Sequence, residues 1–209
     1  KGNTVYLNRM IDANIESYRA IKNAGHEILP EGDKDFKAQM TNIAAKDPDV
    51  VFCPIYYGEA GLAITAARQA GCTATFLGGD GFGSVKDYAS AEDLEGTVYC
   101  SGYAPGTESV AQFEKDYCET YKVDTVPNMF APLAYDAAML MACGLKAAED
   151  KGLTTGTDEY KQAVIEAIDT MNGVEGVTGS YSFDEYNNPI KSVAIIELTN
   201  GEEAFKEMY

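Results

Sequence analysis

The sequence has 209 residues, 45% of them hydrophobic, which is enough for one large α/β domain or two smaller lobes with buried cores. Its 33 acidic and 16 basic residues give a net charge of −17, which makes nucleic acids and anionic lipid surfaces poor partners. No apolar run reaches membrane-spanning length, and we expect no signal peptide within this sequence. The five cysteines lack a C-x-x-C spacing, so they predict no metal site, and we expect Cys53 and Cys143 to be small buried residues.

Strand and helix signals alternate through the first half of the chain. Short apolar runs predict strands at residues 4–7, 50–55, 75–78 and 97–100. Apolar residues spaced three or four apart predict helices at residues 12–24, after residues 32–35, and at residues 58–70. This order is typical of an α/β protein with a Rossmann-like or flavodoxin-like parallel sheet flanked by helices.

The second half is richer in helix. Helical spacing predicts three helices, at residues 109–121, 129–151 and 158–171. A turn-rich segment over residues 173–184 precedes a last strand at residues 192–198, and Asn200-Gly201 is a strong turn signal before the tail. The helices at residues 109–121 and 129–151 carry apolar stripes that need covering, so we expect a homodimer or a rearranged packing.

Two side chains follow predicted strands and are candidates for a ligand site. Tyr56 comes directly after the strand at residues 50–55, and Asp80 stands in a glycine loop after the strand at residues 75–78. In open α/β sheets, ligands bind at the carboxyl ends of the strands, so both side chains point to one crevice. An aromatic wall with one carboxylate suits a small cationic or zwitterionic ligand. The alternatives are that Asp80 only stabilises a turn and that Tyr56 only packs at the strand end.

Catalysis finds little support in the motifs. The glycines around Asp80 match neither a dinucleotide fingerprint nor a phosphate loop, which needs Lys and Ser or Thr at fixed positions. There is no Gly-x-Ser-x-Gly elbow, and the single histidine leaves no obvious base for a nucleophile. Acid–base chemistry by Asp80 and Asp136 would require the two carboxylates to lie close together. We therefore expect a binding protein and no enzyme, with a small α/β enzyme as the weaker alternative.

A series of segments resembles one known family. In order, they are GDKDF at 32–36, DPDVVF at 47–52, YYGEA at 56–60, LGGDG at 77–81, YDAA at 135–138, GVTG at 176–179 and FD at 183–184. Together they resemble the branched-chain amino-acid binding proteins of ABC importers, the type I solute-binding proteins of leucine/isoleucine/valine type. The resemblance covers the chain from about Gly32 to its end.

The resemblance implies a clamshell of two Rossmann-like lobes that closes on one amino acid. Residues 1–102 would be the first part of the second lobe, residues 103–184 remnant helices of the first lobe, and residues 185–209 the return strand and tail of the second. Most of the first lobe would be lacking. Matched by position, Asp80 would receive the ligand's ammonium group, Tyr56 would close over the same end, and Phe130 would form an apolar wall.

The function implied by this resemblance is capture of a small amino acid of the branched-chain type for delivery to a membrane permease. The ligand is a small molecule, the protein partners are ABC permease subunits, and no cofactor, metal or nucleic acid is implied. The expected location is extracellular or periplasmic, with a lipid anchor in a full-length Gram-positive parent. Loss of most of one lobe would impair binding. A ligand-sensing receptor domain is the alternative from another class, because the same clamshell occurs there.

Overall fold

The computed structural model describes Gly25, Glu27, Leu29 and residues 32–209. The strand and helix predicted at residues 4–7 and 12–24 lie outside these described residues. The chain divides into two compact units. One runs to Tyr99 and includes Leu198–Glu203, and the other comprises Cys100–Glu197 with Ala204–Tyr209.

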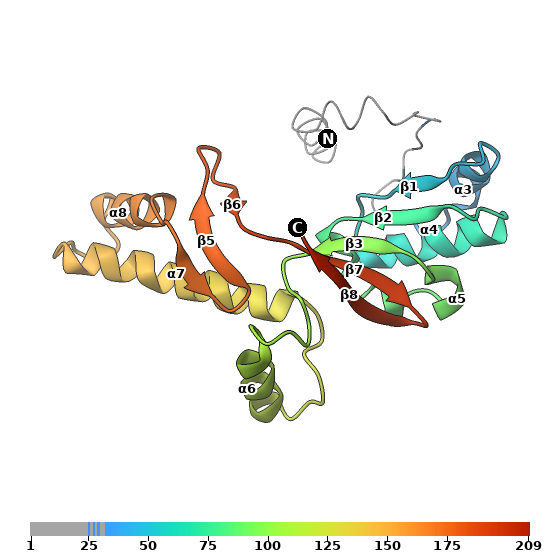
Figure 1. The fold of residues 1–209 in the computed structure, drawn as a ribbon. Helices are drawn as coiled ribbons and strands as arrows, with labels where there is room; N and C mark the ends of the chain where they lie inside the picture. The colour runs from blue at the N-terminus through green and yellow to red at the C-terminus, as the bar shows by residue number, and fades with distance from the viewer. Residues whose placement is uncertain (1–24, 26, 28, 30–31) are drawn as a thin grey trace. The chain divides into compact units, whose positions relative to one another are not determined.

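A five-stranded sheet carries the predicted α/β architecture (Figure 1). Its strands, in spatial order, are β1 (Val50–Phe52), β2 (Thr75–Gly78), β3 (Val98–Ser101), β7 (Ala194–Thr199) and β8 (Glu202–Met208). β1 pairs in parallel with β2, and β2 pairs in parallel with β3. Parallel neighbours require crossover connections. These are α4 (Tyr57–Gln69) and then η1 (Asp80–Phe82), η2 (Val85–Asp87) and α5 (Ala91–Leu94). The predicted parallel sheet with flanking helices is confirmed.

Helices α3 (Lys37–Ala44) and α4 contact each other in the first unit. The side chains of Phe36 and Met40 are both only 1% exposed, as the helical spacing predicts. α4 buries a run of small residues and Ile64, which allows close packing. Near its end, the Arg68 guanidinium lies 5.2 Å from the centre of the Phe76 ring on β2. The helix is thereby fixed to the strand that leads to Asp80.

The predicted turn at Asn200-Gly201 joins β7 to β8. Asn200 has φ 54° and Gly201 has φ 82°, the left-handed pair that a type I′ hairpin turn requires. The residues after it form β8, where we expected only a tail. Charged residues alternate poorly with apolar ones there, so the sequence signal for a strand is weak. The segment forms a strand because it pairs with β7 in the sheet.

The second unit contains the three predicted long helices. These are α6 (Ala111–Tyr121), α7 (Phe130–Asp150) and α8 (Asp158–Asp169), and α7 packs along α8 (Figure 1). The turn-rich segment forms a small antiparallel sheet of β4 (Val174–Gly176), β5 (Gly179–Phe183) and β6 (Pro189–Ile190), which we did not predict. Its strands are short and rich in Gly and Ser, so they lack the apolar alternation of ordinary strands.

Cys53, Cys72, Cys118 and Cys143 form no disulfide with any residue that the structure describes. Cys53 is buried as expected, and burial raises the pKa of its thiol to about 12. Cys143 is exposed, so its predicted burial is wrong. It immediately precedes Gly144, which is buried against α8, and therefore projects from another side of α7. Among the described residues, no helix combines the length and apolar character needed to span a bilayer.

Candidate functional site

Tyr56 and Asp80 lie at the carboxyl ends of neighbouring parallel strands. Tyr56 is extended (φ −83°, ψ 159°) and directly precedes α4, whose residue Ala60 donates its N–H to the Tyr56 carbonyl at 2.9 Å. Asp80 opens η1 two residues after β2 ends. Since β1 and β2 are in parallel register, both residues emerge at the same edge of the sheet.

The loop that carries Asp80 lies directly against the end of β1. A methyl group built on Gly81 would stand 2.9 Å from the Ile55 carbonyl oxygen and 3.3 Å from Cδ1 of Tyr56. A similar group on Gly78 would enter the Phe82 ring at 2.3 Å. Glycine is therefore required at both positions for the loop to reach this place. The approach brings the Asp80 loop and the Tyr56 ring together.

The two candidate side chains are free to meet a ligand. The Tyr56 side chain is 68% exposed, and Asp80 is also exposed. The Asp80 carboxylate accepts no hydrogen bond from any residue that the structure describes. A carboxylate of this kind, beside an aromatic ring, can bind an ammonium group through charge-assisted hydrogen bonds and cation–π contact.

A buried layer beneath the loop holds it in position. Phe82 is fully buried, and its ring centre lies 6.3 Å from that of Tyr99 on β3. Burial first, and then the Glu203 carboxylate, raise the pKa of the Tyr99 phenol well above its usual value, so Tyr99 stays a neutral donor. Glu203 also accepts the N–H of Ser84, a residue with φ 77°, at 3.4 Å. Strand β8 therefore holds the Asp80 loop in position through Glu203.

Phe130, the third candidate, lies in the other unit. It is the first residue of α7, and its N–H donates to Oδ1 of Asn128 at 3.0 Å. The side chain is 40% exposed, which leaves it available to contact a ligand or another surface. Its assignment as a wall of the same site stays a prediction.

Asp136 is the residue whose role the sequence left open. It is fully buried on α7 and accepts hydrogen bonds from the N–H groups of Val177 (2.6 Å) and Thr178 (2.9 Å). The hydroxyls of Thr178 (2.7 Å) and Tyr181 (3.0 Å) donate to it as well. Asp136 is thus a structural anchor for the β4–β5 turn. The YDAA and GVTG segments contained the signal, because they supply the two halves of this contact.

Lys191 completes that cluster and was not predicted. Its Nζ donates to the Tyr181 hydroxyl and the Gly102 carbonyl, each at 3.2 Å, and also to Oγ1 of Thr178. The ammonium lies 4.6 Å from the centre of the Tyr181 ring. Burial lowers the pKa of Lys191, and the Asp136 charge opposes that shift. Two hydroxyls therefore connect a buried carboxylate to a half-buried ammonium.

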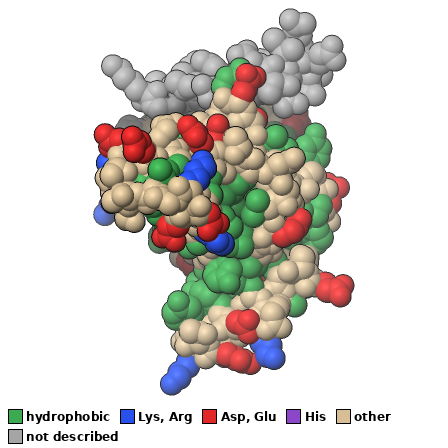
Figure 2. Space-filling view, turned by 90° about the vertical axis from the view of Figure 1, so that its left-hand side faces the viewer, with side chains coloured by type: hydrophobic (Ala, Val, Ile, Leu, Met, Phe, Trp, Pro, Cys, Tyr) green, Lys and Arg blue, Asp and Glu red, His purple; other side chains and the backbone are tan. Residues whose placement is uncertain are grey.

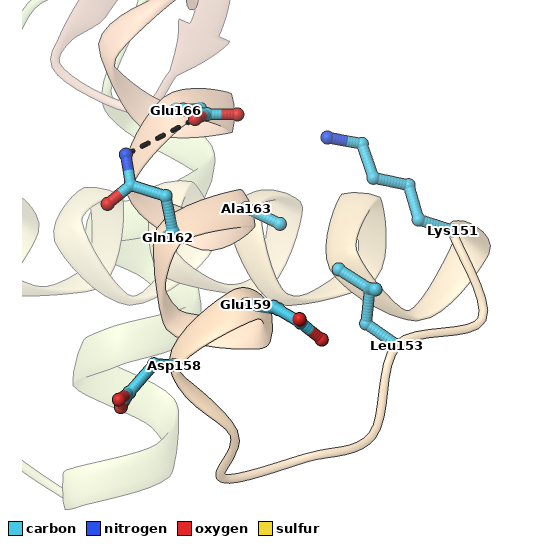
Figure 3. Close-up of a pocket in the computed structure, with 7 residues that line it drawn as sticks. All are labelled: Lys151, Leu153, Asp158, Glu159, Gln162, Ala163 and Glu166. Carbon is cyan, nitrogen blue, oxygen red and sulfur yellow. Dashed lines mark hydrogen bonds between the residues drawn. The ribbon is translucent and has the colours of Figure 1, made fainter.

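Two hollows of the second unit are lined by described residues, and Tyr56 and Asp80 line neither of them. One of about 530 Å³ lies between α8 and the loop after α7, and Figure 3 shows the acidic side chains Asp158, Glu159 and Glu166 around it. There Gln162 already donates to Glu166 at 3.2 Å. The other, of about 980 Å³, runs past the β4–β5 turn and Lys191, whose ammonium already has three oxygen partners.

A parallel sheet with flanking helices that presents an exposed carboxylate and an aromatic ring at neighbouring strand ends favours the class of solute-binding α/β proteins. The comparisons agree, and the chain belongs to the periplasmic binding protein family, which it matches over residues 11–203. Members of this family bind solutes and are not enzymes. The predicted resemblance to branched-chain amino-acid binding proteins is confirmed.

Several relatives are named as binding proteins for leucine or for branched-chain amino acids. The Leu/Ile/Val-binding protein BraC3 of Rhizobium johnstonii is 25% identical over 81% of this chain and 46% of its own length. The leucine-binding protein LivK of Thermotoga maritima is 26% identical, with a TM-score of 0.75 over 88% of this chain and 51% of that one. The substrate-binding protein LivJ of Streptococcus pneumoniae, solved with isoleucine, is 30% identical, with a TM-score of 0.68 over 85% and 50%. The chain spans about half the length of these relatives.

Proposed function

We propose that this chain is a solute-binding component of an ABC importer, with a small aliphatic amino acid as its ligand. The observation that carries the proposal is the Asp80 carboxylate, exposed beside Tyr56 at the carboxyl ends of two parallel strands. It has no partner among the described residues, so it is available for an ammonium group. The binding of isoleucine by the relative LivJ supports the choice of ligand class.

The roles of the three candidate residues follow from their chemistry. Asp80 accepts the ammonium group through charge-assisted hydrogen bonds, each contributing about 1.5–3 kcal/mol. Tyr56 covers the same end of the ligand. Phe130 supplies an apolar wall for the aliphatic side chain, whose full burial contributes about 1.5–3 kcal/mol.

The residues of the proposed site suit reversible binding of a ligand and not a chemical reaction. A ligand stabilises a closed form only by binding it more tightly than the open form, and a membrane permease would then recognise the closed form. We assign residues 1–102 and 185–209 to one lobe and residues 103–184 to the other as part of the same proposal. The place of action would be extracellular or periplasmic.

Thermal unfolding with leucine, isoleucine, valine and a non-cognate acidic amino acid tests the proposal. A ligand at about 100 times its dissociation constant stabilises the folded state by about 2.7 kcal/mol, which raises the midpoint by several degrees. Asp80→Asn removes the charge that holds the ammonium group and is expected to weaken binding by roughly 10-fold to 150-fold.

Asp49→Asn is the matched control. Asp49 is also exposed, but it lies just before β1, at the opposite end of the strand from Tyr56. Its backbone carbonyl accepts the Thr75 N–H, and the substitution leaves that bond intact. An equal loss of binding in Asp80→Asn and Asp49→Asn would refute the proposed site. It would also be refuted if the aliphatic amino acids left the thermal unfolding midpoint of the parent chain unchanged.

A further inference from the structure

Glu203 differs from the exposed acidic residues of this chain. Exposed carboxylates are common, and Figure 2 shows acidic side chains at many separate points of the surface. Glu203 lies on β8 just after the β7–β8 turn and is half-buried. Its carboxylate accepts the N–H of Ser84 at 3.4 Å and a hydrogen bond from the Tyr99 hydroxyl. Through these two contacts it joins β8 to β3 and to the loop that carries Asp80.

Ser84 connects the two short helices of that loop. On one side, the Gly83 N–H donates to the Asp80 carbonyl at 3.2 Å and closes η1. On the other side, the Asp87 N–H donates to the Ser84 carbonyl at 3.1 Å and closes η2. The φ of 77° at Ser84 is left-handed, which is unfavourable for a residue with a side chain and persists where the surrounding structure imposes it. The hydrogen bond to Glu203 is one such constraint, so this contact helps to set the direction in which η1 leaves Ser84.

The hairpin that carries Glu203 is itself fixed within the first unit. The Asn200 N–H in its turn donates to Oε2 of Glu95 at 2.8 Å. The turn also lies against α5, because a methyl group built on Gly201 would stand only 2.9 Å from Cβ of Ala91. Glu203 follows this turn directly along β8 and is therefore a fixed support for the loop.

We propose that Glu203 is a positioning residue of the amino-acid site. Its carboxylate keeps the Asp80 loop in the shape that presents the Asp80 carboxylate to the ammonium group of the ligand. This role rests on the proposed function, because it is a second requirement of the same site. Charge-assisted hydrogen bonds are short and weaken steeply away from their optimal distance and angle. A shift of the loop by about an ångström therefore weakens ammonium binding although the Asp80 charge is still present.

Calorimetric titration of the whole chain tests the proposal, with leucine, isoleucine or valine, whichever raises its unfolding midpoint most. Glu203→Ala is expected to weaken binding by about 10-fold, because the Asp80 loop loses its support. Glu203→Gln should recover most of this loss, since its amide oxygen can still accept the Ser84 N–H. Circular dichroism spectra that match the parent chain establish that each variant is folded.

Glu202→Ala is the matched control. It removes the same charge from the adjacent residue of β8, so any general effect of negative charge on an ammonium ligand appears in both variants. The Glu202 carboxylate is exposed and pairs with Lys86 at 3.0 Å, a type of ion pair that contributes little. Glu202→Ala should therefore change the affinity by less than about 2-fold.

A double variant separates positioning from a general loss of stability. Asp80→Asn removes the charge that Glu203 positions, so adding Glu203→Ala to it should weaken binding by less than about 3-fold more. A residue that only stabilises the unit would cause the same fold loss in both backgrounds. Hydrogen exchange supplies a measurement without ligand. The amides of residues 82–84 should exchange faster in Glu203→Ala, and those of α4 should not.

Three results would overturn the role of Glu203. These are unchanged affinity in Glu203→Ala, an equal loss in Glu202→Ala, and equal losses from Glu203→Ala with and without Asp80→Asn. Failure of the proposed function looks different, because the parent chain would then bind none of the amino acids, and both proposals would fall. Binding by the parent chain that requires Asp80 and not Glu203 would refute the positioning role alone.

Discussion

Removal of the Asp136 carboxylate should destabilise the second unit more than any exposed substitution. The side chain is fully buried and accepts four hydrogen bonds, two from backbone N–H groups and two from hydroxyls. Asp136→Ala leaves these donors unsatisfied and leaves the Lys191 ammonium without its nearest opposite charge. Loss of one partner of a buried ionic cluster costs about 3–5 kcal/mol.

Urea unfolding followed by circular dichroism measures this cost, because the chain has no tryptophan to serve as a fluorescent probe. With a slope of about 2–3 kcal/mol/M, the midpoint should fall by roughly 1–2 M. Lys191→Met should cost less, since the side chain is half-buried and methionine keeps an apolar stem of similar length while it loses the ammonium that lies over the Tyr181 ring. Combined with Asp136→Asn, it should show coupling of about 1 kcal/mol or more.

Asp150→Ala is the control for this experiment. Asp150 accepts from Lys146 at 2.8 Å on the exposed surface of α7, and exposed pairs of this type contribute little to stability because solvent screens them. If Asp136→Ala lowered stability by less than about 1 kcal/mol, or by no more than the control, the buried cluster would not be the anchor that its geometry indicates.

Two further predictions concern the first unit. Gly81→Ala should weaken amino-acid binding by about 10-fold or more, because its methyl group would push the Asp80 loop away from the Ile55 carbonyl. Calorimetric titration measures the affinity, and an unchanged value would mean that the loop tolerates the methyl group. The Cys53 thiol should make the chain less stable above pH 9. Its pKa of about 12 in the folded state exceeds the usual 9.0, so the unfolded chain ionises first, and stability falls by up to about 1.4 kcal/mol per pH unit as the pH rises between these values. Between pH 9 and pH 10, the urea midpoint should fall less steeply with pH for Cys53→Ala than for the parent chain. An equal fall in both would contradict the raised pKa of the Cys53 thiol.

Much of the fold was predictable because its signals are local. Apolar runs and helical spacing predicted β1, β2, β3 and the helices from α4 to α8 within a few residues, apart from the short α5. Periodicity could not reveal β4, β5 and β6, because these short strands are specified by the buried Asp136 and the turn bound to it. Such long-range hydrogen bonds leave no repeat in the sequence.

The candidate site was predictable to a smaller extent. Strand ends and glycines placed Asp80 next to Tyr56, because parallel strands and a tight loop fix that neighbourhood locally. Lys191 escaped notice since its partners lie 10 to 89 residues away along the chain. A lone lysine before a strand resembles an ordinary exposed residue until the fold brings three oxygens to it.

Strand β8 also affects how the chain associates with other molecules. It ends the five-stranded sheet, and open sheet edges can recruit strands from other chains. Along this edge the sequence has Glu202, Glu203, Lys206 and Glu207, and Lys206 is paired with Glu197 of β7 at 3.1 Å. Charges in such density discourage the addition of a further strand. The hairpin therefore makes this edge a poor template for a strand from another chain and protects the sheet from amyloid-like growth.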